Sequence, residues 1–324
     1  MLCQFINYLY MNLLEVVITL LDVLVGLAFV TLLERKILSY VQDRKGPNKV
    51  GLMGIFQPFS DAIKLFSKEN IIVMKSNYMM FYICPVFMFM LMLMVWLVYP
   101  FITNVYYMNY SILYMIMVMS LSSYLILFIG WSSNSLYSMV GAMRSVSQML
   151  SYEVSFILII FILMLLSESY SLYDFLKWQV YSWYMIMLLP IFIVFFISIL
   201  AELNRSPMDF VEGESELVSG FNIEYFSGSF ALIFMAEYGM IIFLSMMSVL
   251  MFTSLGSSYM SCLMINLMVI MVIFMRGMLP RMRYDHLMYL CWKIVLPMVL
   301  SYLILIYSFK FYMVLMIYKL MENF

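Results

Sequence analysis

The chain has 324 residues, of which 66% are hydrophobic and 11% are charged, and its mean hydropathy is +1.01. A soluble domain is about half apolar and a quarter charged, so this composition excludes a water-soluble fold. The net charge of −1 excludes a nucleic-acid partner, because phosphate binding needs a clustered excess of Lys and Arg.

The apolar residues form long stretches that Gly and Pro rarely interrupt, with only 12 Gly and 8 Pro in the chain. Such stretches favour helices over the alternating pattern of an outer-membrane barrel. A helix needs roughly 20 predominantly apolar residues to cross the hydrocarbon core of a bilayer. The sequence therefore predicts an all-α polytopic membrane protein in a single membrane domain, 1–324, with eight transmembrane helices at 13–33, 78–100, 111–131, 138–166, 183–201, 226–252, 257–275 and 294–317.

The first span, 13–33, follows neither a basic segment nor a small-residue cleavage site, so we expect a retained helix and not a cleaved signal peptide. It contains two acids, Glu15 and Asp22. Carboxylates inside a membrane are costly and tend to mark ion or proton paths. The alternative for this pair is a place near the end of the helix, from which the side chains reach the interface.

The connection between the first two spans, 34–77, contains a short segment with its own helical pattern. In residues 55–68 the apolar side chains recur at helical spacing opposite Asp61, Lys64 and Lys68. This segment is too short to span a bilayer, so it predicts an interfacial amphipathic helix. Two roles stay open for it, a simple membrane-surface anchor and a lid under another subunit.

Two further carboxylates fall inside predicted spans. Glu153 lies in the fourth span, with Arg144 nine residues earlier, and Glu237 lies in the sixth. Because an intramembrane acid is expensive, each of them is a candidate for a proton path.

The connection between the fifth and sixth spans, the acidic loop 202–225, holds six acids against one base, Arg205. The acids are Glu202, Asp209, Glu212, Glu214, Glu216 and Glu224. Like charges at this density raise one another's pKa values, so the set would share protons near neutral pH and suit a proton relay. The alternative is a solvated acidic loop. Hydrophobic interruptions in the segment favour partial burial and therefore the functional interpretation.

Arginines gather in the connections 34–77 and 276–293, namely Arg35, Arg44, Arg276, Arg281 and Arg283. They could pair with the carboxylates, bind lipid headgroups or form a docking surface for a soluble partner. Membrane topology alone is a further explanation for basic residues in such loops.

The basic residues also predict the orientation of the chain. Of the 17 Lys and Arg, 14 fall in the connections 1–2, 3–4, 5–6 and 7–8, when Arg144 is counted with connection 3–4. Since basic residues stay on the side from which insertion occurs, both termini should face away from the compartment of synthesis.

Several cofactor classes have no residues to hold them. The four Cys lie far apart without a C-x-x-C pair, and His286 is the only histidine, which excludes a cysteine metal site and bis-histidine haem ligation. There is no G-x-G-x-x-G motif, and GPNKVGLM has Leu52 where a P-loop requires Lys. We therefore expect no metal, flavin, haem or nucleotide to be bound by this chain alone, and no catalytic residue in it.

Between residues 20 and 300 the chain carries six distinctive segments: LLERKILSYVQDRKGPNKVG, QPFSDAIKLFSKE, GWSSNS, AELNRSPMDFVEGESELVSGFNIEY, FMAEY and RGMLPRMRYDHLMYLCWK. At these segments it closely resembles the family of subunit 1 of mitochondrial NADH:ubiquinone oxidoreductase, respiratory complex I. The departures are Ser206 and Met208 where that family usually has Thr and Phe, and Ser145 and Ser147 where Ala is common. They leave every charged position intact.

The resemblance implies a core membrane subunit of a proton-pumping complex, at the place where the membrane arm meets the peripheral arm with its flavin and iron–sulfur clusters. NADH oxidation and the redox centres would belong to partner subunits. This chain would frame the passage by which ubiquinone, the substrate, leaves the bilayer. By carry-over from the family, the residues lining or bordering that passage would be Arg35, Arg44, Asp61 and Phe234.

The same resemblance implies that the acids couple quinone reduction to proton translocation. The coupling set would be Glu153, Glu202, Asp209, Glu212, Glu214, Glu216, Glu224 and Glu237, with Arg144, Arg205, Arg276 and Arg281 as charge partners. The partners implied are other membrane-arm subunits, the quinone-site subunits of the peripheral arm, and lipid, including bound phospholipid. The location implied is the mitochondrial inner membrane, with both termini toward the intermembrane space and the long charged loops toward the matrix.

Two other functions are compatible with the residues taken alone. One is a stand-alone proton-coupled secondary transporter or channel that uses the acids as its ion path. The other is a structural anchor for a membrane-bound hydrogenase-like assembly. Co-purification with flavin and iron–sulfur absorbance would separate a complex I subunit from the transporter, and charge-neutral substitutions in the loop 202–225 would leave turnover unchanged in an anchor.

Overall fold

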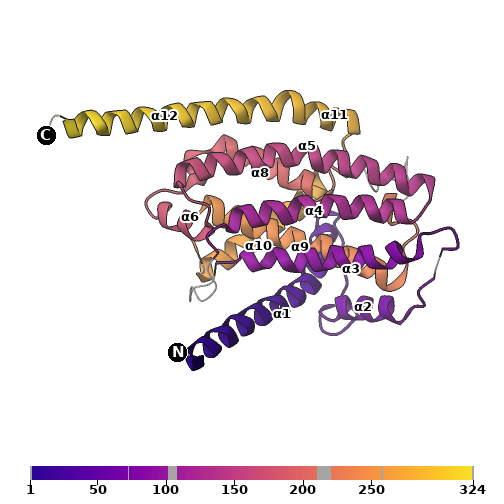
Figure 1. Ribbon diagram of the computed structural model, residues 1–324. Coiled ribbons are helices and arrows are strands. Elements are labelled where there is room, and N and C mark those ends of the chain that lie inside the picture. The colour runs from indigo at the N-terminus through magenta and orange to yellow at the C-terminus, as the bar shows by residue number, and fades with distance from the viewer. Residues whose placement is uncertain (1, 72, 101–107, 210–219, 257, 323–324) are drawn as a thin grey trace.

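The computed structural model describes residues 2–71, 73–100, 108–209, 220–256 and 258–322. All regular secondary structure in these ranges is helical, which confirms the predicted all-α class. The long helices run roughly side by side along one axis, and both termini lie at the same end of the bundle (Figure 1).

Within the described ranges, seven helical stretches are long and apolar enough to span a membrane. They overlap seven of the eight predicted spans. The first stretch, Tyr10–Val41, extends well beyond the predicted end at residue 33, and the last stretch begins at Tyr284 instead of residue 294. That early start joins a short helix, a π-helical turn and the terminal helix into one rod. The stretches are α1 (Leu2–Val41), α3 (Tyr78–Val95) with a 3-10 turn at Trp96–Val98, α4 (Ser111–Ser132), α5 (Leu136–Ser167), α9 (Ser227–Phe252), α10 (Tyr259–Met278), and α11 (Tyr284–Tyr289) with Leu290–Val295 and α12 (Leu296–Glu322).

The predicted fifth span, 183–201, is not one helix. It is divided into α7 (Tyr184–Met187) and α8 (Leu189–Glu202), after a short α6 (Leu172–Trp178). Leu188 between them has non-helical backbone angles, φ −117° and ψ 40°, and Pro190 starts α8 because proline suits only the first turn of a helix. At about 21 Å, α8 is shorter than a hydrocarbon core of about 30 Å.

The direction of α8 in the bundle nevertheless fits the prediction of eight passages. A chain whose two ends lie at the same end of the bundle crosses it an even number of times, so α8 supplies the passage that the seven long helices lack (Figure 1). The site described below lies at the C-terminal end of this short helix.

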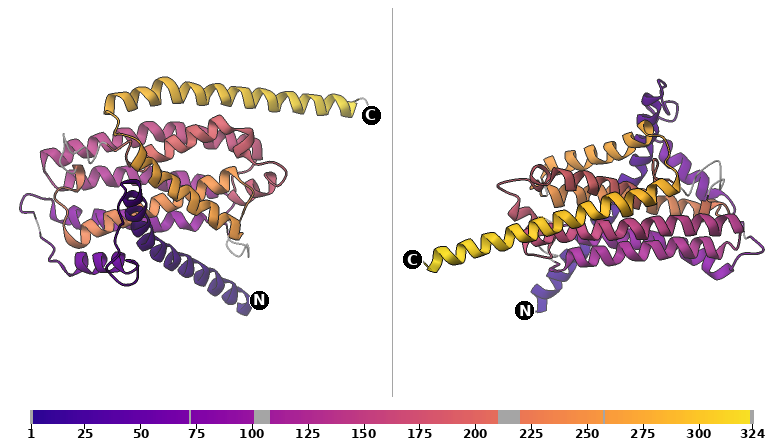
Figure 2. Two further views of the ribbon diagram at one scale, coloured as in Figure 1. Left: turned by 180° about the vertical axis from the view of Figure 1, so that it is seen from behind. Right: turned by 90° about the horizontal axis from the view of Figure 1, so that it is seen from above.

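The core is built around α9, whose C-terminal half is buried almost throughout, including Phe243, Leu244, Met247 and Phe252. The helices α1, α3 and α10 pack against α9, whereas α4, α5 and α8 follow outward from α3 (Figures 1 and 2). Two helices leave this core. The N-terminal half of α1 and the C-terminal half of α12 project away from the bundle in both views.

Small residues allow the closest helix contacts, as is usual in membrane bundles. A Cβ added to Gly130 of α4 would lie 2.2 Å from the Cβ of Ala142 on α5. A Cβ added to Gly141 would lie 2.9 Å from the Cα of Gly220. The glycine at 141 therefore lets the end of the acidic loop rest directly on α5.

The predicted interfacial helix 55–68 is found as α2 (Gln57–Ser67). It is fixed to α9 by the Ser227 hydroxyl, which donates to the carbonyl oxygens of Leu65 (3.1 Å) and Lys68 (2.7 Å). Its Phe59 packs edge-on against Phe29 of α1, with ring centroids 6.1 Å apart. Other apolar side chains of α2, such as Ile63, stay exposed, as expected for a helix that lies in a membrane interface.

Candidate functional site

A buried ion cluster lies where α1, α9, α10 and the segment after α8 meet. Its centre is Glu34 of α1, which is only 5% exposed. The Glu34 carboxylate accepts hydrogen bonds from Arg205 (3.3 Å) and Arg276 at one oxygen, and from the Tyr238 hydroxyl (2.5 Å) at the other. Four separate parts of the chain thus converge on one carboxylate.

Arg205 is the most enclosed cation of this cluster. Its guanidinium carbon lies 4.5 Å from the ring centroid of Tyr238, a cation–π contact. Burial alone would lower the pKa of Arg205, but Tyr238, Glu34 and Glu237 raise it above its ordinary value. Arg205 therefore stays charged, and any proton that moves here must move between carboxylates or water.

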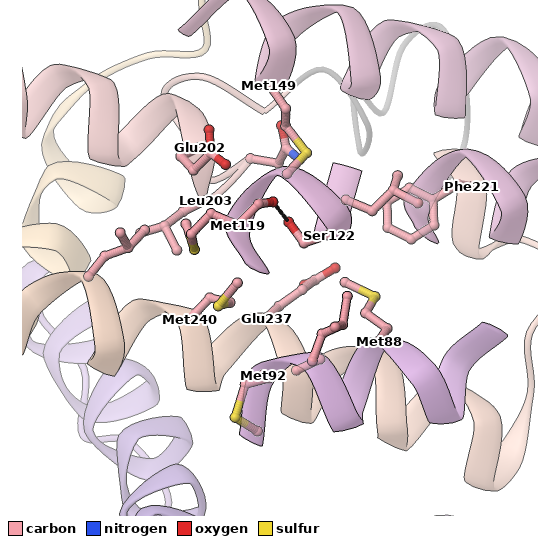
Figure 3. Close-up of a pocket in the computed structure, with 15 residues that line it drawn as sticks. Met88, Met92, Met119, Ser122, Met149, Glu202, Leu203, Phe221, Glu237 and Met240 are labelled. Atoms are coloured by element: carbon pink, nitrogen blue, oxygen red, sulfur yellow. Dashed lines mark hydrogen bonds between the residues drawn. The ribbon is translucent and has the colours of Figure 1, made fainter. Parts of the chain in front are cut away.

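Next to this cluster is an apolar cavity bounded by α3, α4, α5, α8 and α9 (Figure 3). Glu237 projects from α9 into it, between Met88 of α3 and Ser122 of α4, and Glu202 borders it from the end of α8. The cavity leaves about 40 Å³ to the centres of water molecules, which is room for a few waters. Its wall is otherwise mostly apolar, with Leu91, Met92, Met119, Ile126, Met149, Leu203, Ala236, Met240 and Leu244.

A second, polar cavity adjoins the first and shares Asn204, Phe221 and Glu237 with it. It is lined further by Arg205, Asp209, Asn222 and Arg276. Buried polar atoms face this region without a hydrogen-bond partner in the described chain, namely Glu202 Oε2, Asn204 Oδ1, Asn222 Oδ1 and Arg205 Nη2. Such atoms are commonly satisfied by bound water. The two cavities together lead from Glu202 through Glu237 to the ion cluster.

The backbone around Glu202 is held by a buried amide. Gln148 of α5 donates to the carbonyl oxygens of Ala201 (2.9 Å) and Met208 (2.8 Å). These two bonds fix the end of α8 and the following segment to α5. They thereby hold in place Glu202 and the buried Asp209, the two acids that flank Arg205 in the sequence.

The structure brings together part of the predicted coupling set. Glu153, half-buried on α5, interacts electrostatically with Glu202, and Glu237 does so with Arg205. Glu224 is half-buried just before α9. The predicted residues Glu212, Glu214 and Glu216 lie outside the described residues.

The four predicted charge partners lie in different parts of the structure. Arg205 and Arg276 belong to the buried cluster. Arg144 lies within α5 and not in the connection with which its charge was counted. Arg281 is exposed beyond α10.

Two of the four predicted passage residues form a pair. Arg35 of α1 donates to Asp61 of α2 (2.6 Å), and Gln57 donates to the other oxygen of that carboxylate (3.0 Å). Arg44 instead donates to Gln42 within its own loop (3.0 Å). Phe234 is half-buried on α9 against Phe230, with ring centroids 4.3 Å apart.

The site residues predicted from the sequence include neither Glu34 nor Tyr238. Glu34 is followed directly by Arg35 and Lys36, so it read as part of a basic loop. The available signal was its position at the end of an unbroken apolar run of the first span, because a carboxylate in such a run calls for a buried partner.

Comparisons with known proteins relate the chain to one family. The model of the NADH dehydrogenase family matches residues 14–307. The chain is similar to NADH-ubiquinone oxidoreductase chain 1 of Aedes aegypti, with 48% identity over 299 residues, covering 91% of this chain and 95% of the relative. It is similar to the proteins of that name from Locusta migratoria (49% over 298 residues, 91% and 94% covered) and Apis mellifera ligustica (47% over 299 residues, 92% and 97% covered).

Proposed function

The chain belongs to the NADH dehydrogenase family, and on that premise we propose that it frames the ubiquinone passage and couples quinone reduction to proton translocation through its carboxylates. Family membership makes the chain a multi-pass subunit of NADH:ubiquinone oxidoreductase, respiratory complex I, in the mitochondrial inner membrane. Its partners are other subunits of that complex.

One observation carries the coupling proposal. Glu202 and Glu237 line the apolar cavity, and Glu237 also lines the adjoining polar cavity together with Arg205 and Arg276, the two partners of Glu34. Protons cross an apolar bundle only along groups that can exchange them, and carboxylates bridged by a few waters are such groups. Glu153 extends the route at the end marked by Glu202.

The link to quinone chemistry runs along α1. Arg35, which pairs with Asp61 in the proposed passage, is the residue next to Glu34 in the ion cluster. A change of charge in the passage that moves Arg35 therefore acts on the backbone that carries Glu34. The guanidinium groups of Arg205 and Arg276 would then shift their ion pairing between Glu34 and Glu237. The acid that loses its cationic partner takes up a proton more easily, and the acid that gains one releases a proton more easily.

The orientation is part of the proposal. Both termini would face the intermembrane space, and the connections rich in Lys and Arg would face the matrix. Support comes from the bundle, in which α2 and the connection that follows it lie toward the end opposite both termini (Figure 1). Exposed Arg281 and Arg283 would then meet the quinone-site subunits of the peripheral arm.

A phospholipid would occupy a cavity between α5 and α12. It offers about 230 Å³ to the centres of water-sized spheres, with an apolar wall of Phe161, Met164 and Leu165. At its mouth Lys310 pairs with Glu168 (2.6 Å), a neutral pair that suits a zwitterionic headgroup. Lys310→Met should lower the phospholipid retained by the purified complex, and Lys177→Met, which breaks an exposed pair with Asp174, should not.

The coupling proposal is tested with Glu237→Gln in the assembled complex. The amide keeps the size of the side chain but cannot exchange a proton, so proton pumping with ubiquinone as acceptor should fall while NADH oxidation by artificial acceptors stays intact. The control is Glu69→Gln, which neutralises an exposed carboxylate in the connection between α2 and α3. An unchanged ratio of protons to electrons in Glu237→Gln would contradict coupling and leave only an anchoring role.

A further inference from the structure

A stripe of polar residues runs along the outer half of α1. Asn12, Glu15, Thr19, Asp22 and Gly26 follow one another at spacings of three and four residues. This spacing places them on one face of the helix over about 21 Å. A polar or small residue at each step of such a pattern is typical of a helix that packs against another helix inside a membrane.

Asp22 lies where an exposed carboxylate is energetically unfavourable for the isolated chain in a membrane. Asp22 is one residue from the middle of the predicted span 13–33. It is exposed, and no hydrogen bond or ion pair links it to any residue in the part of the chain that the structure describes. A carboxylate at mid-membrane is rarely left facing lipid, because neither water nor a counter-charge is available there.

The rest of this chain covers the stripe only in part, because Asn12, Glu15, Thr19 and Gly26 are half-buried whereas Asp22 is exposed. The outer half of α1 leaves the bundle in every view, and only 11% of its most apolar window is buried (Figures 1 and 2). Gly26, at the inner end of the stripe, faces Ile242 of α9, with 3.8 Å between an added Cβ and the isoleucine methyl. The stripe therefore begins at the bundle and continues along the part of α1 that leaves it. In that stretch Asn12 Oδ1 is also buried without a partner.

We infer that this stripe is the docking face for a transmembrane helix of another subunit, one that presents a basic or amide side chain to Asp22. A donor of this kind satisfies the carboxylate, and the small Gly26 and Thr19 allow the backbones to approach. A lipid acyl chain offers no donor, and a second copy of α1 would oppose two carboxylates. The inference rests on the chain being a subunit of a membrane complex and not on the coupling role proposed above.

The first test uses a photo-activated cross-linking residue in the assembled complex. At position 19, on the stripe, it should capture another membrane subunit, whereas at position 17, where Val17 is 54% exposed on a different face, it should capture lipid. Adducts from position 19 to lipid alone, or to this chain alone, would overturn the inference. Capture of the same subunit from both positions would also overturn it, since the stripe would then not define the face.

The second test replaces Asp22 itself. Asp22→Leu makes the span more apolar, so membrane insertion is not weakened. If the inference holds, assembled complex should still fall by roughly threefold to tenfold, the range expected for one interhelical polar contact. Asp22→Asn keeps an acceptor and should fall less, and an equal fall would support the same face with a cationic donor. Full assembly of Asp22→Leu would overturn the inference. Protons pumped per electron, measured on the complex that does assemble, report separately on the coupling role.

Discussion

At the scale of single residues, the charge balance around Glu34 decides the stability of the site. One carboxylate neutralises part of two guanidinium groups, and all three side chains lie inside the bundle or at its edge. A buried ion pair is not a large gain over an apolar core, but removal of one partner leaves the other charged and unsolvated. Glu34 is thus a residue whose loss costs more than its presence contributes.

This argument predicts a contrast between two substitutions. Glu34→Gln leaves Arg205 and Arg276 without their shared carboxylate and should destabilise the subunit by about 3–5 kcal/mol. Asp61→Asn breaks the Arg35 pair, in which the side chains are 52% and 34% exposed, and should cost about 0–1 kcal/mol. Thermal unfolding of the solubilised complex, followed by loss of this subunit, measures both. Equal unfolding midpoints for the two variants would contradict the larger stability cost expected at the buried Glu34.

The residues that sequence reasoning found and missed differ in one physical respect. Asp61 and Glu237 stand out locally, one opposite the apolar face of a short helix and one inside an apolar span. Glu34 is defined by partners at 205, 238 and 276, and no local pattern records such distant contacts. Which acids share a cavity was unpredictable for the same reason, because it depends on how five helices pack.

At the scale of helices, hydropathy predicted where the spans are but not how they end. The fifth span is apolar throughout, and Pro190 was the one local sign of the break at Leu188. The break matters because it sets the register of α8 and puts Glu202 at the helix end, beside the cavities, where Gln148 can fix the backbone that follows.

The contact between α4 and α5 gives a prediction at this scale. Gly130→Ala would place a methyl group 2.2 Å from the Cβ of Ala142, an atom fixed to the backbone of α5. The helices must separate, and overpacking of this kind costs about 1–3 kcal/mol. Gly228→Ala is the matched control, because its new Cβ meets only the side chains of Asn70 and Phe66, at an ordinary 3.8 Å or more. The unfolding midpoint of the complex should fall for Gly130→Ala alone, and a similar fall in both would point to helix flexibility instead of packing.

At the scale of the whole molecule, topology and charge give the same arrangement by independent routes. The count of Lys and Arg predicts that both termini lie on one side, and the bundle places both ends together (Figure 1). This arrangement requires an even number of passages through the bundle. One of them must then be made by α8, although α8 is shorter than the seven long apolar helices. The geometry of the bundle does not assign a compartment to either side, so that assignment needs a chemical test.

Cysteine labelling supplies that test. Tyr181, next to α6 at the end of the bundle that carries the termini, and Met74, between α2 and α3 at the other end, are both fully accessible, at 97% and 101% exposure. In a background where Cys3 and the exposed Cys262 are replaced by Ser, an impermeant maleimide added to mitoplasts should label Tyr181→Cys and not Met74→Cys. In inverted submitochondrial particles Tyr181→Cys should be protected, because its side of the bundle then faces the lumen. Labelling of Met74→Cys alone in mitoplasts would show the opposite orientation. Labelling of both positions in mitoplasts would mean that α3, α4 and α5, which separate them along the chain, do not all cross the membrane.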